Sequence, residues 1–386
     1  MSMDKKVPEI RFNDFGEEWN GRCLGSLCLI GDIDHRMPES KTTGIPYLMT
    51  GDFCGINGLD FKNAKLISIE DYELLSKKIK PEYGDILFAR YASVGSVRYV
   101  ETKIDFLISY SCAIIKTNNT SYGKFLFYCF QTDNTQEKIE LDINTGSQRN
   151  IGIDSLKNLF VFLPKSEEQI VIGNYFQKLD SLIIQHQQKH DKLSNIKKAM
   201  LEKMFPKPGV KIPEIRFKGF SGEWHEVVLS SVIDVRSGKD YKKLGTGNIP
   251  VYGTGGYMLS VDSALSDNEN AIGIGRKGTI DKPYILHAPF WTVDTLFYAV
   301  PFSNFNLKFV FCLFQKIDWK RHNESTGVPS LSRAAINNVS VYVTNELEQI
   351  KIGNYFQKLD TLINQHQQQI TKLNNIKQAC LSKMFV

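Results

Sequence analysis

Apolar residues recur every three or four positions in two long segments, 166–206 and 345–386. This period predicts two amphipathic helices of roughly 40 residues, each about 60 Å long. Ser166-x-x-Gln169 and Asn345-x-x-Glu348 have the pattern of capping boxes at their starts. The apolar positions form a heptad seam for helix–helix packing. Its members are Ile172, Phe176, Leu179, Ile183, His186, Leu193 and Met200, and then Ile352, Phe356, Leu359, Ile363, His366, Ile370 and Leu373.

Polar residues interrupt this seam. His186, His190 and His366 are open to a metal interpretation, but a polar layer that fixes helix register accounts for them, and no metal site is assigned. Lys197 and Lys377 also fall on seam positions near the far ends of the helices, where we expect their ammonium groups to extend outward to water.

The two helical segments are copies of each other. Residues 168–205 return as 348–385, and a second pair, VPEIRFNDFGEEW at 7–19 and IPEIRFKGFSGEW at 212–224, opens each half. The intervening stretches hardly resemble each other. This order predicts a first domain (1–165), a first spacer helix (166–206), a second domain (207–344) and a second spacer helix (345–386). Short connections favour antiparallel neighbours, so we expect a coiled-coil pair with an approximate twofold axis.

The intervening stretches read as short strands separated by glycine turns. Strand-rich segments are followed by an amphipathic helix at about 124–139 in the first half and by a helix within 304–319 in the second. Both domains are therefore expected to share an α+β fold. Gly273, Gly275 and Gly278 match G-x-G-x-x-G, but TIDKPYIL follows. That segment predicts strand-turn-strand rather than the helix that a dinucleotide site needs.

Composition narrows the class of protein. A net charge of +5 permits a polyanionic partner without requiring one. The seven cysteines include no Cys-x-x-Cys pair, which favours a reducing compartment. We expect a cytoplasmic protein, because the start lacks a signal-peptide pattern and no apolar run is long enough for a membrane span. The motifs His-Glu-x-x-His, Gly-x-Ser-x-Gly and Asn-Pro-Pro-aromatic are missing, so no catalytic residue is assigned.

The loops of both domains are rich in cationic, hydroxyl and amide side chains with tyrosines between them. Such side chains bind phosphates and read base edges, although loop solvation explains any one of them alone. As a set on two linked domains they favour DNA binding. In the first domain they are Arg36, Lys41, Thr42, Thr43, Arg90, Tyr91, Arg98, Ser147, Gln148, Arg149 and Asn150; in the second they are Lys239, Lys242, Lys243, Thr254, Tyr257, Arg276, Lys277, Ser330, Ser332 and Arg333.

Several motifs together resemble the specificity subunit of type I restriction-modification enzymes. They are PEIRFNDFGEEW and PEIRFKGFSGEW at the two domain starts, PEYGDILFAR, the segments TGSQRNIGIDSLKNLFVFLP and STGVPSLSRAAINNVSVYVT, and EQIxIGNYFQKLDxLIxQHQ…KMF in both helices. The resemblance implies two target recognition domains that each read one half of a bipartite double-stranded DNA target, with the helices as spacer. It also implies two modification subunits docked around the helices, and restriction subunits joining them.

The same resemblance implies a non-catalytic chain without a cofactor. S-adenosylmethionine, ATP and Mg are then expected on the partner subunits, which carry the methyltransferase and endonuclease activities. Two other interpretations stay open from the residues alone. One is a coiled-coil adaptor whose two domains bind proteins or other ligands and have no DNA role, and the other is an autonomous nuclease or methylase.

Overall fold

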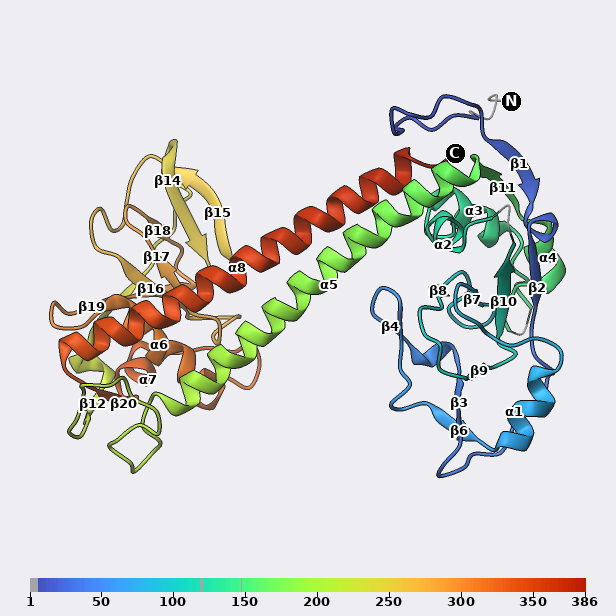
Figure 1. Cartoon of the computed structure of the whole chain (residues 1–386). Helices are drawn as coiled ribbons and strands as arrows, with labels where there is room; N and C mark the ends of the chain where they lie inside the picture. The colour runs from blue at the N-terminus through green and yellow to red at the C-terminus, as the bar shows by residue number, and fades with distance from the viewer. Residues whose placement is uncertain (1–5, 119–120, 147) are drawn as a thin grey trace. The chain divides into compact units, whose positions relative to one another are not determined.

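The computed structural model describes residues 6–118, 121–146 and 148–386 (Figure 1). The chain divides into two compact units, Met1–His186 with Gln368–Val386, and Gln187–Gln367. Two helices of 38 residues each, α5 (Ser166–Lys203) and α8 (Glu346–Lys383), run without interruption. Each helix therefore contributes one part to each unit, and each unit also contains one mixed domain.

The described residues of the first domain form four small groups of strands and four short α-helices. A four-stranded antiparallel sheet has the order β2 (Cys28–Gly31), β10 (Cys112–Thr117), β7 (Ile86–Ala89), β8 (Val97–Tyr99). A three-stranded sheet has the order β6 (Lys65–Ile67), β3 (Ile45–Leu48), β9 (Leu107–Ile108), and β3 runs parallel to β9. The remaining elements are the β1–β11 pair (Asn20–Cys23 and Phe160–Leu163), the β4–β5 hairpin (Phe53–Cys54 and Gly58–Leu59), α1 (Ile69–Ser76), α2 (Gly123–Cys129), α3 (Asp133–Leu141) and α4 (Ile153–Asn158).

The domain of the second unit repeats this topology. Its four-stranded sheet has the order β13 (Ile233–Ser237), β19 (Leu296–Pro301), β16 (Ala271–Gly275), β17 (Tyr284–Leu286). Its three-stranded sheet has the order β15 (Gly256–Val261), β14 (Thr246–Gly253), β18 (Trp291–Thr292). The β12–β20 pair (His225–Val228 and Ser340–Val343), α6 (Leu307–Lys316) and α7 (Arg333–Asn337) complete it. The shared strand order confirms the expected pair of α+β domains, to which the first domain adds α1, α3 and the β4–β5 hairpin.

Two local expectations were wrong. The segment expected to form one helix at about 124–139 forms two, α2 and α3. The second helix begins after Thr132, because the Thr132 hydroxyl accepts a hydrogen bond from the Thr135 N–H at 3.3 Å and so caps α3. Asn345 caps α8, with Glu348 N donating to its side chain at 3.0 Å, whereas the Glu348 carboxylate binds Arg216 and Thr344. Ser166, however, is the first residue of α5 rather than its cap. The dinucleotide motif lies in β16 and a turn before β17, as the strand-turn-strand interpretation predicts.

The first part of each long helix packs into the core of its own domain. Ile172, Phe176 and Leu179 join the first core with Phe125 of α2, and Ile352, Phe356 and Leu359 join the second core with Phe309 of α6. Of the other seam positions, Ile183 and Ile370 are buried, and His186, Leu193, Met200, Ile363, His366 and Leu373 are half-buried. The seam therefore serves domain packing as well as helix pairing.

The two long helices are antiparallel within each unit, as expected. In the first unit Tyr175 Oη lies 3.6 Å from Cys380 Sγ, and Asp180 Oδ1 lies 2.7 Å from Lys377 Nζ. In the second unit Lys197 Nζ lies 2.5 Å from Asp360 Oδ1. Residue numbers rise along one helix as they fall along the other. The expectation that Lys377 and Lys197 extend to water was wrong, because each faces an aspartate of the other helix.

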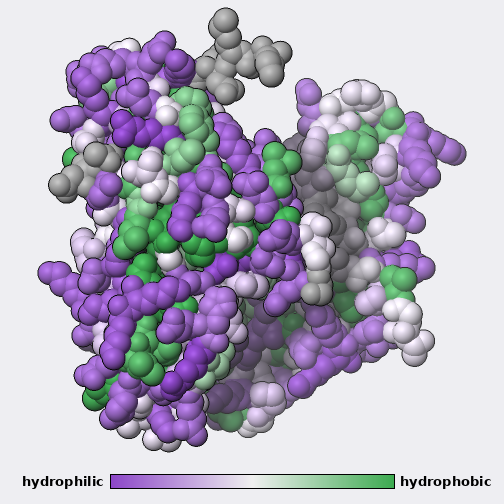
Figure 2. All heavy atoms as spheres, turned by 90° about the vertical axis from the view of Figure 1, so that its right-hand side faces the viewer, coloured by the Kyte–Doolittle hydropathy of each residue, from purple (hydrophilic) through white to green (hydrophobic). Residues whose placement is uncertain are grey.

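The surface is mixed in polarity. On the face shown in Figure 2, hydrophilic residues are widespread and hydrophobic residues gather in bands between them. Within the described ranges, none of the helices combines the length and apolar character that a membrane-crossing helix needs. Among the same residues, no three His, Cys, Asp or Glu side chains gather as metal ligands, and His190 Nδ1 instead lies 3.0 Å from Asp191 Oδ1.

Candidate nucleic-acid interface

Each PEIRF arm is fixed to the first turn of a long helix by a buried arginine–glutamate pair. Arg11 donates from Nε and Nη2 to the two carboxylate oxygens of Glu168, both at 2.7 Å. Arg216 donates in the same way to Glu348, at 2.6 and 2.7 Å. The glutamate side chains are 2% and 0% exposed. Bidentate pairs of this kind set geometry as well as energy, so the repeated arms lock each domain to its helix.

The glutamine after each of these glutamates ties the helix to the start of a domain helix. Gln169 accepts a hydrogen bond from the Tyr122 N–H at 2.8 Å and donates to Pro164 O at 2.9 Å. Gln349 makes the same two bonds, with Asn306 N at 3.0 Å and Thr344 O at 2.8 Å. Tyr122 and Asn306 are the residues just before α2 and α6. The repeated Glu-Gln dipeptide is therefore a matched joint, and its role was missed from sequence although its repetition marked it.

Gly173 and Gly353 let the long helices approach these domain helices closely. A Cβ atom at Gly173 would lie 2.9 Å from Tyr122 and 3.0 Å from the Phe125 amide nitrogen. One at Gly353 would lie 2.8 Å from both Asn306 and Lys308 and 2.9 Å from the Phe309 amide nitrogen. Backbone atoms cannot move aside as a flexible side chain can. Both positions therefore require glycine.

We expect Gly173→Ala and Gly353→Ala each to lower the free energy of unfolding by about 1–2 kcal/mol, because the overpacking exceeds the gain of about 1 kcal/mol that alanine normally brings to a helix interior. Urea unfolding followed by circular dichroism measures this. Gln185→Ala, at an exposed position of the same helix, is the matched control and is expected to be neutral. Stabilisation by either glycine substitution would contradict the close approach.

In the second domain, most of the predicted DNA-binding residues lie in loops at one edge of the four-stranded sheet, where β13 and β16 end. β13 and β16 both run antiparallel to β19, so the loops after them, with Lys239 and with Arg276 and Lys277, start at the same edge. Lys277 forms a bridge with Ser330, and Leu331 N donates to Arg276 O at 3.0 Å. We call this the second-domain edge, comprising Lys239, Thr254, Arg276, Lys277, Ser330 and Arg333.

The side chains of the second-domain edge are held but accessible. Arg276 and Lys277 are exposed, and the Arg276 guanidinium lies 5.8 Å from the centre of the Phe297 ring. Arg333 donates to Ser237 Oγ at 3.3 Å, beside the end of β13. Ser332 caps α7 and accepts from Ala335 N at 3.0 Å, which is a structural role. Lys242 and Lys243 lie exposed further along the loop after β13.

The corresponding edge of the first domain has a different character. Ile151 N donates to Arg90 O at 3.1 Å, and Tyr91 forms a bridge with Asn150, which repeats the backbone arrangement of the second domain. Arg90 itself is only 6% exposed, and it donates to Asp32 Oδ2 at 2.5 Å and to Ile151 O at 3.0 Å. Burial alone would raise the pKa of Asp32, but Lys78, His35 and Arg90 around it lower that pKa. Arg90 is therefore a buried structural cation.

The remaining first-domain candidates divide into two groups. Arg98 is committed inside the domain: it donates to Gly58 O at 3.1 Å and to Gly55 O at 3.2 Å, it covers the Phe53 ring, and burial lowers its pKa. The exposed group lies in loops, where Arg36 pairs with Asp71, Lys41 with Glu39 and Arg149 with Glu140. Thr42, Thr43 and Gln148 are exposed as well. Ser147 lies outside the described residues.

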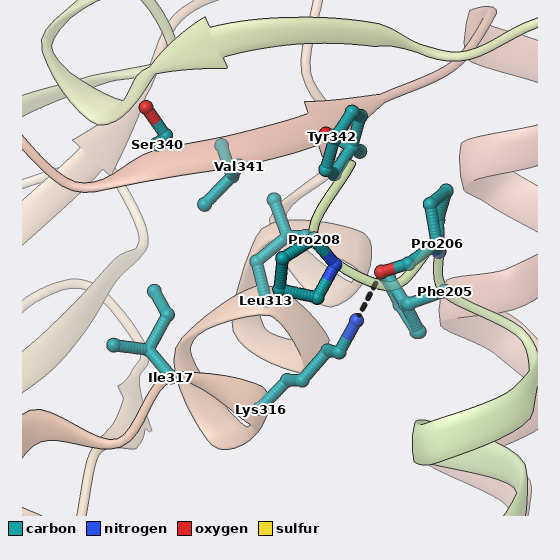
Figure 3. A pocket seen from close by; sticks show the side chains of 9 residues that line it. All are labelled: Phe205, Pro206, Pro208, Leu313, Lys316, Ile317, Ser340, Val341 and Tyr342. Carbon is teal, nitrogen blue, oxygen red and sulfur yellow. Dashed lines mark hydrogen bonds between the residues drawn. The ribbon is translucent and has the colours of Figure 1, made fainter. Parts of the chain in front are cut away.

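A pocket of about 170 Å³ lies where α5 enters the second domain (Figure 3). Its lining is mostly apolar, and Lys316 Nζ donates to Pro206 O at 2.6 Å across it. Burial lowers the pKa of Lys316. The lysine therefore holds the chain that follows α5 against α6, and the pocket is part of this structural joint.

Two domains of one topology, each locked to the start of one long helix and each carrying its own loop residues, define a protein built by internal duplication. The family model for the type I restriction modification DNA specificity domain matches residues 16–195 and 221–375. The chain belongs to this family of specificity subunits, which has a non-catalytic role.

The chain is also similar to a known protein in sequence and to solved structures in fold. A protein described as a putative type I specificity subunit of Mycoplasma genitalium is 24% identical over 271 residues, which cover 68% of this chain and 70% of that one. The crystal structure of a type I restriction-modification S subunit from M. genitalium matches with a TM-score of 0.75 and 20% identity over 98% of this chain and 99% of the other. A chain from a structural study of complex assembly in the type I R-M system matches with a TM-score of 0.50 and 15% identity over 94% and 96% of the two chains.

Proposed function

We propose that each domain of this specificity subunit reads one half of a bipartite DNA target. One observation carries the proposal: the two domains share their topology and their helix joints but differ at the edge where the candidate DNA-binding residues lie. Two matched scaffolds with unlike edges suit two different half-sites. The functional division is residues 1–165 and 207–344 for reading, and 166–206 and 345–386 for spacing.

The long helices set the separation of the half-sites in this proposal. Both are single helices of 38 residues, and a helix transmits its length because its backbone hydrogen bonds resist bending. Bases between the half-sites are then unread, as dimer geometry leaves bases unread between operator halves. Two modification subunits dock around the helices, and restriction subunits join them. The partner subunits, rather than this chain, bind S-adenosylmethionine, ATP and Mg.

The proposed contacts follow from accessibility. Arg90 and Arg98 drop out because they are committed inside the first domain, and Ser332 drops out because it caps α7. Exposed cations position each domain on phosphates, and hydroxyl, amide and tyrosine side chains read bases. The proposed set is Arg36, Lys41, Thr42, Thr43, Tyr91, Gln148, Arg149 and Asn150, with Lys239, Lys242, Lys243, Thr254, Tyr257, Arg276, Lys277, Ser330 and Arg333.

The experiment is selection from a random duplex library by the chain assembled with its modification subunits. We expect two short motifs at a fixed separation. Replacing residues 225–343 by the same region of another family member is expected to change one motif and to leave the other motif and the separation intact, because the helices and the first domain are unaltered. A change in both motifs would contradict one-domain, one-half reading.

Salt titration of the same complex separates this proposal from a coiled-coil adaptor. Each phosphate contact contributes about −0.9 to the slope of log affinity against log salt, so six contacts give a slope of about −5. For an adaptor whose domains bind proteins or other ligands, no such salt dependence of duplex affinity is expected. A slope near zero would therefore favour the adaptor.

A further inference from the structure

The β14–β15 hairpin (Figure 1) is a two-stranded ribbon, and its turn contains Thr254, a residue of the second-domain edge. The strands pair from Ile249 opposite Val261 to Gly253 opposite Gly256, and Thr254 and Gly255 make the turn. Tyr284 Oη donates to Gly253 O at 2.6 Å, and Val293 N donates to Tyr252 O at 3.0 Å. These bonds hold the base of the tip, so its position in the domain is set.

Two large apolar side chains are exposed next to this turn. Tyr257 is 63% exposed and Met258 is 49% exposed. The pairing shifts at this point: Tyr257 lies opposite Tyr252 and Leu259 opposite Val251, so Met258 is the extra residue of a β-bulge. The Tyr257 ring lies 6.4 Å from the Tyr252 ring, and a Cβ atom at Gly253 would lie 2.7 Å from Met258 Sδ. Both side chains are thus supported at one side while their outer atoms remain accessible.

Exposed cations lie beside the tip. A Cβ atom at Gly278 would lie 3.9 Å from Thr254 Oγ1, which places the turn carrying Arg276 and Lys277 against the tip. Gly278 N also donates to Pro329 O at 2.8 Å, so the loop before Ser330 meets the same place. Cations around an apolar ribbon tip match a duplex, whose phosphates flank a groove that is wide enough for a β-ribbon.

The first domain has no equivalent ribbon among its described residues. Its β3 and β6 are joined by residues 49–64, which contain the β4–β5 hairpin. Arg98 holds that insertion through the carbonyl oxygens of Gly55 and Gly58. The ribbon tip is therefore a property of the second domain alone, and its effect on DNA should be confined to one half-site.

We propose that the Tyr257–Met258 tip enters a groove of the duplex and makes apolar contacts with bases. The inference deepens the proposed function and rests on it: Arg276 and Lys277 bind the flanking phosphates, and the tip supplies sequence preference at the half-site of the second domain. Ring faces and thioethers contact bases and the thymine methyl group without needing a hydrogen-bond partner.

The test compares Tyr257→Ala and Met258→Ala with the conservative variants Tyr257→Phe and Met258→Leu in the complex with modification subunits. We expect each alanine variant to bind the wild-type-selected duplex roughly 5- to 100-fold more weakly, as loss of a base contact does. Selection from the random library should lose base preference in one motif only. The salt slope should stay unchanged, and the conservative variants should behave as wild type.

Lys277→Gln is the matched control for a phosphate contact. It is expected to weaken binding to all duplexes and to reduce the salt slope by about one. Thermal melting by circular dichroism should be unaltered in all of these variants, because the substituted side chains are exposed.

Two classes of outcome overturn the inference. If the alanine variants select both motifs as wild type does, or if they weaken all duplexes equally with a smaller salt slope, the tip does not contact bases while the proposed function stands. If the wild-type complex selects no two-part motif, the proposed function is overturned and this inference falls with it.

Discussion

Replacing Arg11 by methionine is expected to lower the free energy of unfolding of the first unit by about 3–5 kcal/mol, because the substitution leaves the Glu168 carboxylate buried without its cation. The carboxylate is 2% exposed and loses two hydrogen bonds of 2.7 Å. Arg216→Met acts in the same way on Glu348 in the second unit. Hydrogen exchange measures both losses: we expect faster exchange in the peptide 166–180 of the Arg11→Met variant and in the peptide 346–360 of the Arg216→Met variant.

Two controls separate the buried charge from lost packing. Lys6→Met removes an exposed ion pair with Glu18, at 3.7 Å, and is expected to cost less than about 1 kcal/mol. The double variant Arg11→Met with Glu168→Leu removes both charges and should recover most of the lost stability. Equal effects of Arg11→Met and Lys6→Met would contradict the joint between arm and helix.

The long helices could be predicted because a helical period is local information, and their antiparallel pairing could be predicted because the two helical segments repeat. Apolar residues that recur every three or four positions over about ten turns indicate a helix and nothing else. Because the two helical sequences are copies, an antiparallel pair of them is nearly symmetric. The break at Thr132 was missed because a helix can start again within an apolar pattern when a hydroxyl caps it. The cap of α5 was misplaced by one residue because serine suits both the cap position and the first turn.

Burial of polar residues could not be predicted, because it depends on partners far away in sequence. Arg90 and Arg276 occupy the same place, just after β7 and just after β16, and their carbonyl oxygens accept equivalent bonds from Ile151 N and Leu331 N. Arg90 is buried because Asp32, at the end of β2, neutralises it, whereas the end of β13 has Ser237. The periodicity of apolar residues does not indicate whether an aspartate or a serine lies beside the arginine. The DNA-binding set from sequence therefore mixed structural cations with accessible ones.

The same limit explains the seam lysines. An apolar period shows which face of a helix is covered but not which polar group lies opposite. Lys377 and Lys197 lie on that covered face, and each meets the aspartate that ends an IGNYFQKLD copy, Asp180 or Asp360. The repeat thus encodes two cross-helix ion pairs that only the antiparallel register brings together.

Loss of the first of these pairs should cost more than loss of the second. Lys377→Met leaves Asp180 with the Tyr128 hydroxyl, which donates to Oδ2 at 2.8 Å, and no cation; both Lys377 and Asp180 are buried. We expect a loss of about 3–5 kcal/mol in the first unit. Burial, with the charge of Asp180, also raises the pKa of Tyr128, so the tyrosine stays a donor and cannot replace the cation.

Lys197→Met is the matched control from the other copy of the repeat. Asp360 is 32% exposed, so water screens its charge and the expected loss is about 1 kcal/mol. Urea unfolding of the full chain, with hydrogen exchange at 368–383 and at 187–203 to locate each loss, measures both variants. Equal losses, or a larger loss for Lys197→Met, would show that burial does not set the strength of the cross-helix pairs. Asp180→Asn combined with Lys377→Met removes both charges, and it should restore stability only if the uncompensated carboxylate causes the loss.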